Sequence, residues 1–323
     1  MEAKGRRAMR MWMGVLAVAL VALAGCGRSP ATPGATATVA PTSTSTSPTT
    51  EPSTEPSTST SEPTTTPTSP RPTTSPTTRT MLTGMPVYFV GASSGPGLKL
   101  YREFRTVPRI DGPISSTISA MTRLTPLDPD YFNPWRSASW VKVSDEAATL
   151  TVDISADAFR NTNVGSELAS VAVQQLVYTA LAAGEVTGND AHSVVITVNG
   201  GRYDAWGAVH LEGRWQRAPM VEVQAQSWIV EPQEGATVRA GTVQFTGYGT
   251  SFEATFRWRV LGMDNRTNLS GTAMGGSMGT FGPVRFSAKL SPGLYLVELY
   301  TDDPSGSAEG DGPAVDTKQF TVR

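Results

Sequence analysis

The chain has few of the residues from which catalytic and metal centres are usually built. Its 323 residues include one cysteine and two histidines, His192 and His210. Neither histidine stands at metal-ligand spacing from a second histidine or a cysteine. No HExxH motif or phosphate loop occurs, and the glycine-serine segments 91–95 and 275–279 are predicted to be turns between strands, without the strand-turn-helix context of a nucleophile elbow. We therefore expect no enzymatic activity, no catalytic residue, no metal and no cofactor.

A regular calcium loop is also missing. Four acidic residues stand close together near the C-terminus, but without the every-second-residue spacing of a calcium loop: Asp302, Asp303, Glu309 and Asp311. The spacing favours a solvated acidic loop over a calcium site.

The chain has no surplus of positive charge. Its formal net charge is −2, and residues 1–25 carry four basic residues and one acidic residue. Without those residues the net charge would be −5, so little is left to attract a phosphate backbone. We expect no nucleic-acid partner. The apolar run from Met11 to Leu23 is shorter than the roughly 20 residues that span a bilayer.

The only cysteine, Cys26, closes that apolar run. Basic residues precede the run, and the small residues Ala24 and Gly25 follow it, a pattern typical of a secretory signal peptide over residues 1–25. The segment Leu23–Cys26 resembles the processing site of bacterial lipoproteins. The resemblance implies that the thiol of Cys26 carries a diacylglyceryl group, with acyl chains such as palmitate, and that the chain is cut before it. The alternative is a lone buried cysteine that packs as a small hydrophobe.

Residues 26–84 are predicted to be a disordered linker. From Ser29 to Thr80, 41 of 52 residues are Thr, Ser or Pro, and none is aromatic. Such a segment cannot bury enough apolar surface to offset the entropy of ordering it. Frequent proline favours polyproline II, whose rise of about 3.1 Å per residue gives a maximum reach of roughly 160 Å. The composition also resembles O-glycosylated stalks, and a bare spacer would serve equally well.

The remaining residues fit two domains, 85–212 and 227–323, with a polar stretch between them. The first is expected to follow the order β-β-α-β-β-α-β, an α+β arrangement of helices on one small sheet. Apolar alternation and helical spacing place its strands near 86–90, 98–107, 140–143, 149–154 and 192–199, and its helices near 111–124 and 166–183. Asp111 is the expected N-cap of the first helix.

Several segments of this first domain resemble, in order and spacing, the GerMN domain, the sporulation and germination domain of bacterial lipoproteins. They are Val87–Val90, Leu100–Arg105, Val152–Ser155 with Phe159, Gln174–Thr179 and Val198–Gly200. The resemblance spans about Met85 to Val209. One departure lies at residues 123–129, where the family usually has a leucine-rich helix end and a Gly-Pro pair. The shape of the loop that follows, and any partner it binds, are therefore left open.

The second domain is predicted to be an all-β immunoglobulin-like sandwich, because short alternating strands are bounded by Gly, Pro, Asp or Ser. Trp258 stands where an immunoglobulin strand buries a tryptophan, and Tyr295 has the spacing of a tyrosine corner. Val297 occupies the position of the cysteine in antibody domains. This second domain resembles the immunoglobulin-like domain of bacterial spore-germination lipoproteins, which often follows a GerMN domain.

The candidate binding surface is an aromatic loop formed by Tyr131, Phe132, Trp135 and Trp140. Exposed, these rings could stack on sugars or contact a protein. The alternative is that Trp135 and Trp140 fold back as a small core over the helix at 114–124.

Taken together, the resemblances imply a non-enzymatic lipoprotein on the extracytoplasmic face of the cell membrane, anchored in the lipid bilayer through acylated Cys26. It would act as a protein-interaction module with an envelope protein partner, either of the sporulation and germination type or as an accessory in sensing and envelope homeostasis. The alternative is a peptidoglycan-binding protein of the cell wall.

Overall fold

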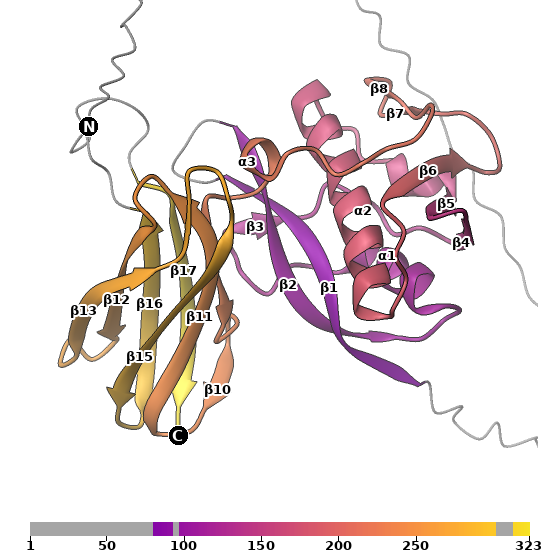
Figure 1. Ribbon diagram of the computed structural model, residues 1–323. Coiled ribbons are helices and arrows are strands. Elements are labelled where there is room, and N and C mark those ends of the chain that lie inside the picture. Colours follow the sequence, from indigo (N-terminus) through magenta and orange to yellow (C-terminus); the bar gives the residue numbers. More distant parts are fainter. Residues whose placement is uncertain (1–79, 93–96, 302–312) are drawn as a thin grey trace, which may run out of the picture. The chain divides into compact units, whose positions relative to one another are not determined.

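The computed structural model describes residues 80–92, 97–301 and 313–323 (Figure 1). The predicted signal peptide, Cys26 and nearly all of the predicted linker lie outside the described residues. None of the described helices combines the length and the apolar character that crossing a membrane requires. The first strand, β1, begins at Met81, so regular structure starts before Met85, where the sequence placed it.

The first half begins with a long antiparallel hairpin. β1 (Met81–Ala92) pairs with β2 (Leu98–Pro108) on one side and with the short β3 (Tyr131–Phe132) on the other. Residues 85–91 are all buried because both faces of β1 are covered. Val87 and Phe89 belong to one apolar cluster, whereas Tyr88 and Val90 pack with Tyr178 in another.

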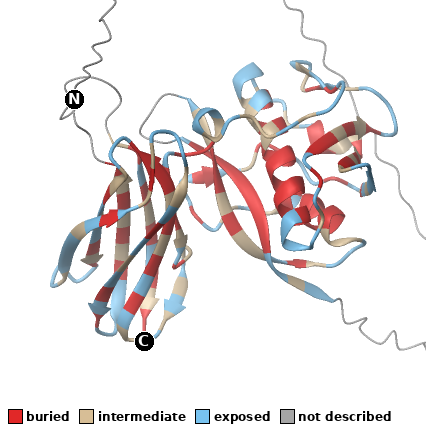
Figure 2. Ribbon diagram, in the orientation of Figure 1, coloured by how far each residue is buried: buried red, intermediate tan, exposed pale blue. Residues whose placement is uncertain are grey.

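Two helices accompany this hairpin. α1 (Pro113–Arg123) starts with proline at its first position, where a missing N–H does no harm, and its N-cap is Gly112 instead of the expected Asp111. α2 (Ser166–Val186) packs on β1 and on α1. Its middle is red in Figure 2, since residues 175–184 are buried without interruption.

The later strands form a second sheet instead of joining the first. β4 (Val141–Glu146), β5 (Thr149–Ile154) and β6 (Ser193–Val198) pair in that order. β3 pairs with β1 only at Val90 and Gly91, and β4, β5 and β6 pair with one another and not with β1 or β2. The single small sheet expected from the sequence is therefore wrong. Short elements complete this half: η1 (Ala156–Phe159), β7 (Asp204–Ala205), β8 (Val209–His210) and α3 (Met220–Val223).

The second half is a sandwich of two sheets. One has the strand order β10-β17-β16-β12-β13, and in the other β11 pairs with β9, β14 and β15. The strands are β9 (Ser227–Glu231), β10 (Ala236–Val238), β11 (Gly241–Ser251), β12 (Thr255–Gly262), β13 (Asn268–Met274), β14 (Gly276–Ser277), β15 (Gly282–Leu290), β16 (Gly293–Thr301) and β17 (Val315–Val322). Alternate residues of both sheets, such as Phe245, Val297 and Phe320, fill the core between them.

The tyrosine corner is confirmed. The hydroxyl of Tyr295 donates a hydrogen bond to the carbonyl oxygen of Ser291 at 2.9 Å, and Val297 is fully buried in the sandwich core. The prediction for Trp258 is wrong, because this side chain is only half-buried and stacks on Phe286 with ring centroids 4.7 Å apart. Trp258 therefore closes the side of the core instead of filling its centre.

The two halves share buried residues. Trp228 of β9 is 1% exposed, and its apolar cluster consists mainly of residues from the first half. The backbone N–H of Ala225 donates to the carbonyl oxygen of Leu100 at 3.1 Å. The described residues of the two halves accordingly belong to one compact unit. The division into domains 85–212 and 227–323 stays a prediction.

Candidate functional site

The aromatic loop does not form the exposed surface that the sequence suggested. Tyr131 and Trp135 are 7% and 4% exposed. The ring of Trp135 lies 5.0 Å from those of Phe159 and Trp206, so the alternative of a packed ring is correct for this residue. Phe132 is 38% exposed, and Trp140 is half-buried with the ammonium group of Lys142 5.2 Å from its ring.

Tyr131 is buried because alternate residues of β3 point to opposite faces. Its ring stacks on that of Tyr101, with centroids 4.2 Å apart, while Phe132 points the other way. The prediction of an exposed aromatic surface is thus wrong for Tyr131 and Trp135. The sequence could not show it, because the strand has only two residues.

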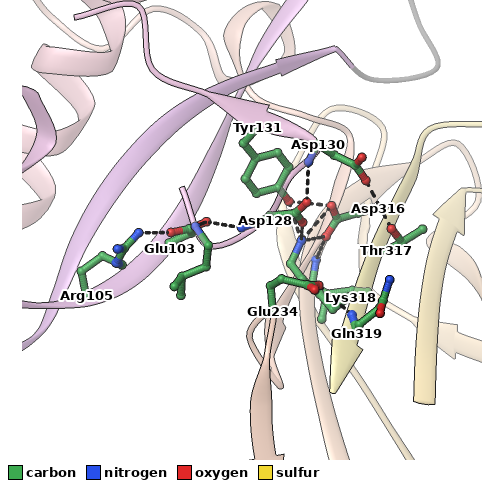
Figure 3. Close-up of polar contacts among 12 residues, drawn as sticks. Glu103, Arg105, Asp128, Asp130, Tyr131, Glu234, Asp316, Thr317, Lys318 and Gln319 are labelled. Carbon is green, nitrogen blue, oxygen red and sulfur yellow. Dashed lines mark hydrogen bonds and ion pairs between the residues drawn. The ribbon is translucent and has the colours of Figure 1, made fainter. Parts of the chain in front are cut away.

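Instead, Tyr131 belongs to a buried group of charged and polar side chains, which we call the Lys318 cluster: Asp128, Tyr131, Asp316 and Lys318 (Figure 3). Two members come from the loop before β3 and from β3 itself, and two come from β17. The side chain of Lys318 is 4% exposed, and those of both aspartates are 2% exposed. The cluster therefore joins the first half of the fold to the sandwich through groups that are shielded from water.

All three donors of the Lys318 ammonium group are used. The group donates to a carboxylate oxygen of Asp128, to the hydroxyl oxygen of Tyr131 at 2.7 Å and to Asp316 Oδ2 at 2.9 Å. The Tyr131 hydroxyl in turn donates to Asp316 Oδ1 at 2.5 Å. Asp316 Oδ2 also accepts the backbone N–H of Ile229 at 2.6 Å. Every member thus has a partner, as buried polar groups require.

Burial and neighbouring charges together raise the pKa values of three members of the cluster. Burial alone would lower the pKa of Lys318, but the attraction of Asp316 and Asp128 outweighs burial and raises the pKa above 10.5. Burial raises the pKa of Asp316 above 3.8, against the attraction of Lys318. Burial and the neighbouring carboxylates raise the pKa of Tyr131 well above 10.0.

A second buried acid fixes the loop that supplies Asp128. Glu103 on β2 is 4% exposed, and its Oε1 atom accepts the backbone N–H groups of Leu127 at 2.8 Å and Asp128 at 3.2 Å. Its other oxygen accepts a charged hydrogen bond from Arg105 at 2.6 Å. Burial raises the pKa of Glu103 above 4.5 in spite of these donors. The backbone at Leu127 and Asp128 is therefore held by β2 as well as by the contact with β17.

Further polar contacts surround the cluster. Gln233 Oε1 accepts the backbone N–H of Phe104 at 3.0 Å, and Thr317 donates to a carboxylate oxygen of Asp130 at 3.3 Å. Glu234 accepts the backbone N–H of Gln319 at 2.6 Å, and burial raises its pKa above 4.5. The contacts of Thr317 and Gln319 extend the polar contact along β17 (Figure 3).

The sequence analysis missed Asp128, Asp316 and Lys318. A signal was present, because Asp316 and Lys318 share the alternation of Phe320 and Val322, which face the sandwich core. Two charged residues on the inward face of a strand indicate a buried ion pair. Asp128 carries no comparable signal, because its loop has no periodicity.

The arrangement suits a fixed contact better than a reaction, because its groups are inaccessible and saturated with one another. Within residues 80–92, 97–301 and 313–323, no group of three or more acidic, histidine or cysteine side chains is placed to hold a metal ion. His210 is exposed and contacts Asp204 with Nδ1 and Oδ1 2.5 Å apart. His192 is exposed as well.

Two segments of the chain match models of protein families. Residues 86–204 match the family described as Sporulation and spore germination. Residues 226–308 match the Immunoglobulin-like domain of bacterial spore germination. These matches confirm the domain content and the order that the sequence predicted. Asp128 and Tyr131 lie inside the first match, whereas β17, with Asp316 and Lys318, lies beyond the second.

No curated protein matches the chain. Among solved structures, one similar chain belongs to the crystal structure of an engineered protein from the Northeast Structural Genomics Consortium. It is 15% identical, with a TM-score of 0.24, and the match covers 50% of this chain and 39% of that one. A TM-score of this size does not indicate a shared fold.

Removal of the Lys318 ammonium group should destabilise the fold strongly. In the Lys318→Met variant, Asp128 and Asp316 would be buried without a cation, which typically costs about 3–5 kcal/mol. The free energy of unfolding, from urea denaturation of the full-length protein, measures this loss. Lys289→Met, at an exposed position of β15, should change it by less than about 0.5 kcal/mol. Similar losses in both variants would contradict the role of the cluster.

Alkaline pH should weaken the fold through the same cluster. The pKa values of Lys318 and Tyr131 are raised in the folded state, so their stabilising contributions are complete below the unfolded pKa values and are lost as pH rises through the folded ones. Thermal stability should therefore fall above about pH 10. The fall should be shallower in Tyr131→Phe than in Tyr300→Phe, which changes a half-buried tyrosine of β16. Equal slopes in the two variants would refute the assignment.

Proposed function

We propose that this protein is a non-enzymatic lipoprotein of the cell envelope that presents two germination-type domains as one rigid interaction module. The lipid anchor would be acylated Cys26, and the linker that follows would hold the folded part away from the bilayer on its extracytoplasmic face. The module would bind an envelope protein, as an accessory of sporulation and germination type or of sensing and envelope homeostasis.

The observation that carries this proposal is the buried contact between the two halves of the fold. Independent binding modules on one chain need no fixed arrangement, and contacts between domains are often small and polar. Here Lys318 is saturated by groups of both halves, and Trp228 of the sandwich belongs to the apolar cluster that forms the core of the first half. A partner that contacts both halves would therefore meet a preformed surface, which lowers the entropic cost of binding.

The non-enzymatic part of the proposal is supported by how the titratable groups are used. Lys318 and Asp316, whose pKa values are shifted, point into a closed cluster that is shielded from solvent. Perturbed groups at catalytic sites normally line an accessible cleft.

The peptidoglycan alternative has less support from the structure. Sugar binding by stacking needs an open aromatic face. Of the four candidate aromatics, Tyr131 and Trp135 are buried, and Trp140 is half-buried beside Lys142. Phe132 is the most exposed ring of the four, and a single ring is a poor platform for a glycan strand.

The anchor is tested by replacing the thiol. Cys26→Ala should abolish acylation and move the protein from the membrane fraction to the soluble or unprocessed fraction, because a signal-type segment without its lipid attachment point gives no stable anchor. Fractionation and mass analysis of the native protein measure the change. An acyl-free N-terminus at Met1 in the wild-type protein, with unchanged fractionation of the variant, would refute the anchor.

The interaction module is tested by crosslinking in living cells. A photoreactive amino acid placed at Phe252, which is 68% exposed, or at Phe132 should give an adduct with an envelope protein, identified by mass spectrometry. The adduct should disappear in the Cys26→Ala background, because the released protein no longer lies at the membrane. Adducts that are removed entirely by peptidoglycan digestion would favour the wall-binding alternative.

A further inference from the structure

A pocket of about 360 Å³ lies between the end of α1 and the loop that leads to β4. Its lining includes Arg123 at the end of α1, Phe132 of β3, and Asn133 and Arg136 of the following loop. The volume falls within the range of roughly 300–1,000 Å³ that is typical of ligand sites. Nothing in the family descriptions assigns a ligand to this pocket.

The wall of the pocket is preformed. The side-chain amide of Asn133 donates to the carbonyl oxygens of Met121 at 2.6 Å and Leu124 at 3.0 Å. Its oxygen accepts the backbone N–H of Trp135 at 3.2 Å. These bonds tie the loop to the last turn of α1 and satisfy carbonyl groups that a helix end leaves free. A ligand would therefore not need to order the loop.

The pocket carries positive charge. Two arginines line it, and no aspartate or glutamate does. Arg123 is oriented by bonds from its Nε and Nη2 atoms to the backbone oxygen and hydroxyl of Ser119. The side chain of Arg136 is exposed, and its backbone N–H donates to the carbonyl oxygen of Ala158 at 2.9 Å. Its guanidinium group, which has five N–H donors, makes no hydrogen bond or ion pair with the described residues.

The rim of the pocket adds one apolar contact. Phe132 is 38% exposed, because the alternation of β3 that buries Tyr131 turns the neighbouring ring outward. The pocket thus offers two guanidinium groups beside one open aromatic ring. Guanidinium groups bind carboxylates through paired hydrogen bonds, and the ring can pack against an aliphatic side chain.

We propose that this pocket binds an acidic peptide segment of a protein partner, with a carboxylate side chain held by Arg123 and Arg136 and a neighbouring apolar side chain packed on Phe132. The inference rests on the proposed function as an interaction module and specifies the chemistry of one surface. A peptide is favoured over a glycan because the rings of Tyr131 and Trp135 are buried and offer no stacking platform.

Fluorescence anisotropy with the full-length protein in detergent tests the proposal. The probe is a labelled six-residue peptide in which Glu and Leu alternate, and its Gln–Leu analogue serves as the uncharged comparison. The Glu–Leu peptide should bind saturably and more weakly as salt rises. Arg136→Gln should raise the Kd of the protein for this peptide about fivefold, because an exposed contact between an arginine and a carboxylate contributes about 1 kcal/mol. Phe132→Ser should weaken the binding as well.

Arg202→Gln is the matched control, because Arg202 is also an exposed arginine of the first half and lies outside the pocket. It should leave the Kd unchanged. Equal binding of the Gln–Leu peptide, an equal effect of Arg202→Gln, or no saturable binding would each overturn the proposal. So would displacement of the peptide by soluble muropeptides at lower concentration than by the unlabelled peptide. Absence of an in-cell adduct at Phe252 in the protein with an intact Cys26 would count against the proposed function. Failure of the peptide assay alone would not.

Discussion

The arrangement of the two halves depends on the buried ammonium group of Lys318. Moving a charge out of water costs several kcal/mol, and only partners in good geometry offset this cost. Asp128, Tyr131 and Asp316 together meet all three donors. An arrangement that displaced β17 from the loop before β3 would leave buried charges unpaired. The cluster therefore contributes mainly to the choice of one arrangement, since an apolar contact of equal size would tolerate small shifts.

This contact also compensates for the lack of disulfides. Asp128 and Lys318 are 190 residues apart, and Tyr131 and Asp316 are 185 apart. The entropic cost of closing a loop grows only slowly with its length, so pairing residues this far apart costs little more free energy than pairing nearer ones. The apolar share of the contact includes Trp228, which belongs to the apolar cluster of the first half while its ring packs near Tyr248 and Phe281 of the sandwich. Polar and apolar contacts thus act on the same pair of halves.

Features that follow from local periodicity could be predicted from the sequence. The β1–β2 hairpin, α2 and the hydrogen bond of Tyr295 all appear where alternation, helical spacing and turn residues placed them. Features that depend on distant partners could not. The two separate sheets are built by pairings between segments far apart in the sequence, such as β1 with β3 and β5 with β6, which local alternation does not specify. The burial of Tyr131 and the half-exposure of Trp258 have the same cause, because neighbours far along the chain decide them. Part of the Lys318 cluster could have been predicted, because Asp316 and Lys318 occupy positions on the inward face of β17.

Tyr131 belongs to two environments at once. Its hydroxyl is bonded to Asp316 and Lys318, and its ring lines the pocket beside Arg123. A ligand of the pocket that stabilises this shape of the loop also stabilises the contact between the loop and β17. By thermodynamic linkage, the contact with β17 increases the affinity for that ligand by the same free energy. Substitutions on β17 could then tune affinity without touching the occupant. The sandwich would in this way act as a remote regulator of a surface to which it contributes no side chain.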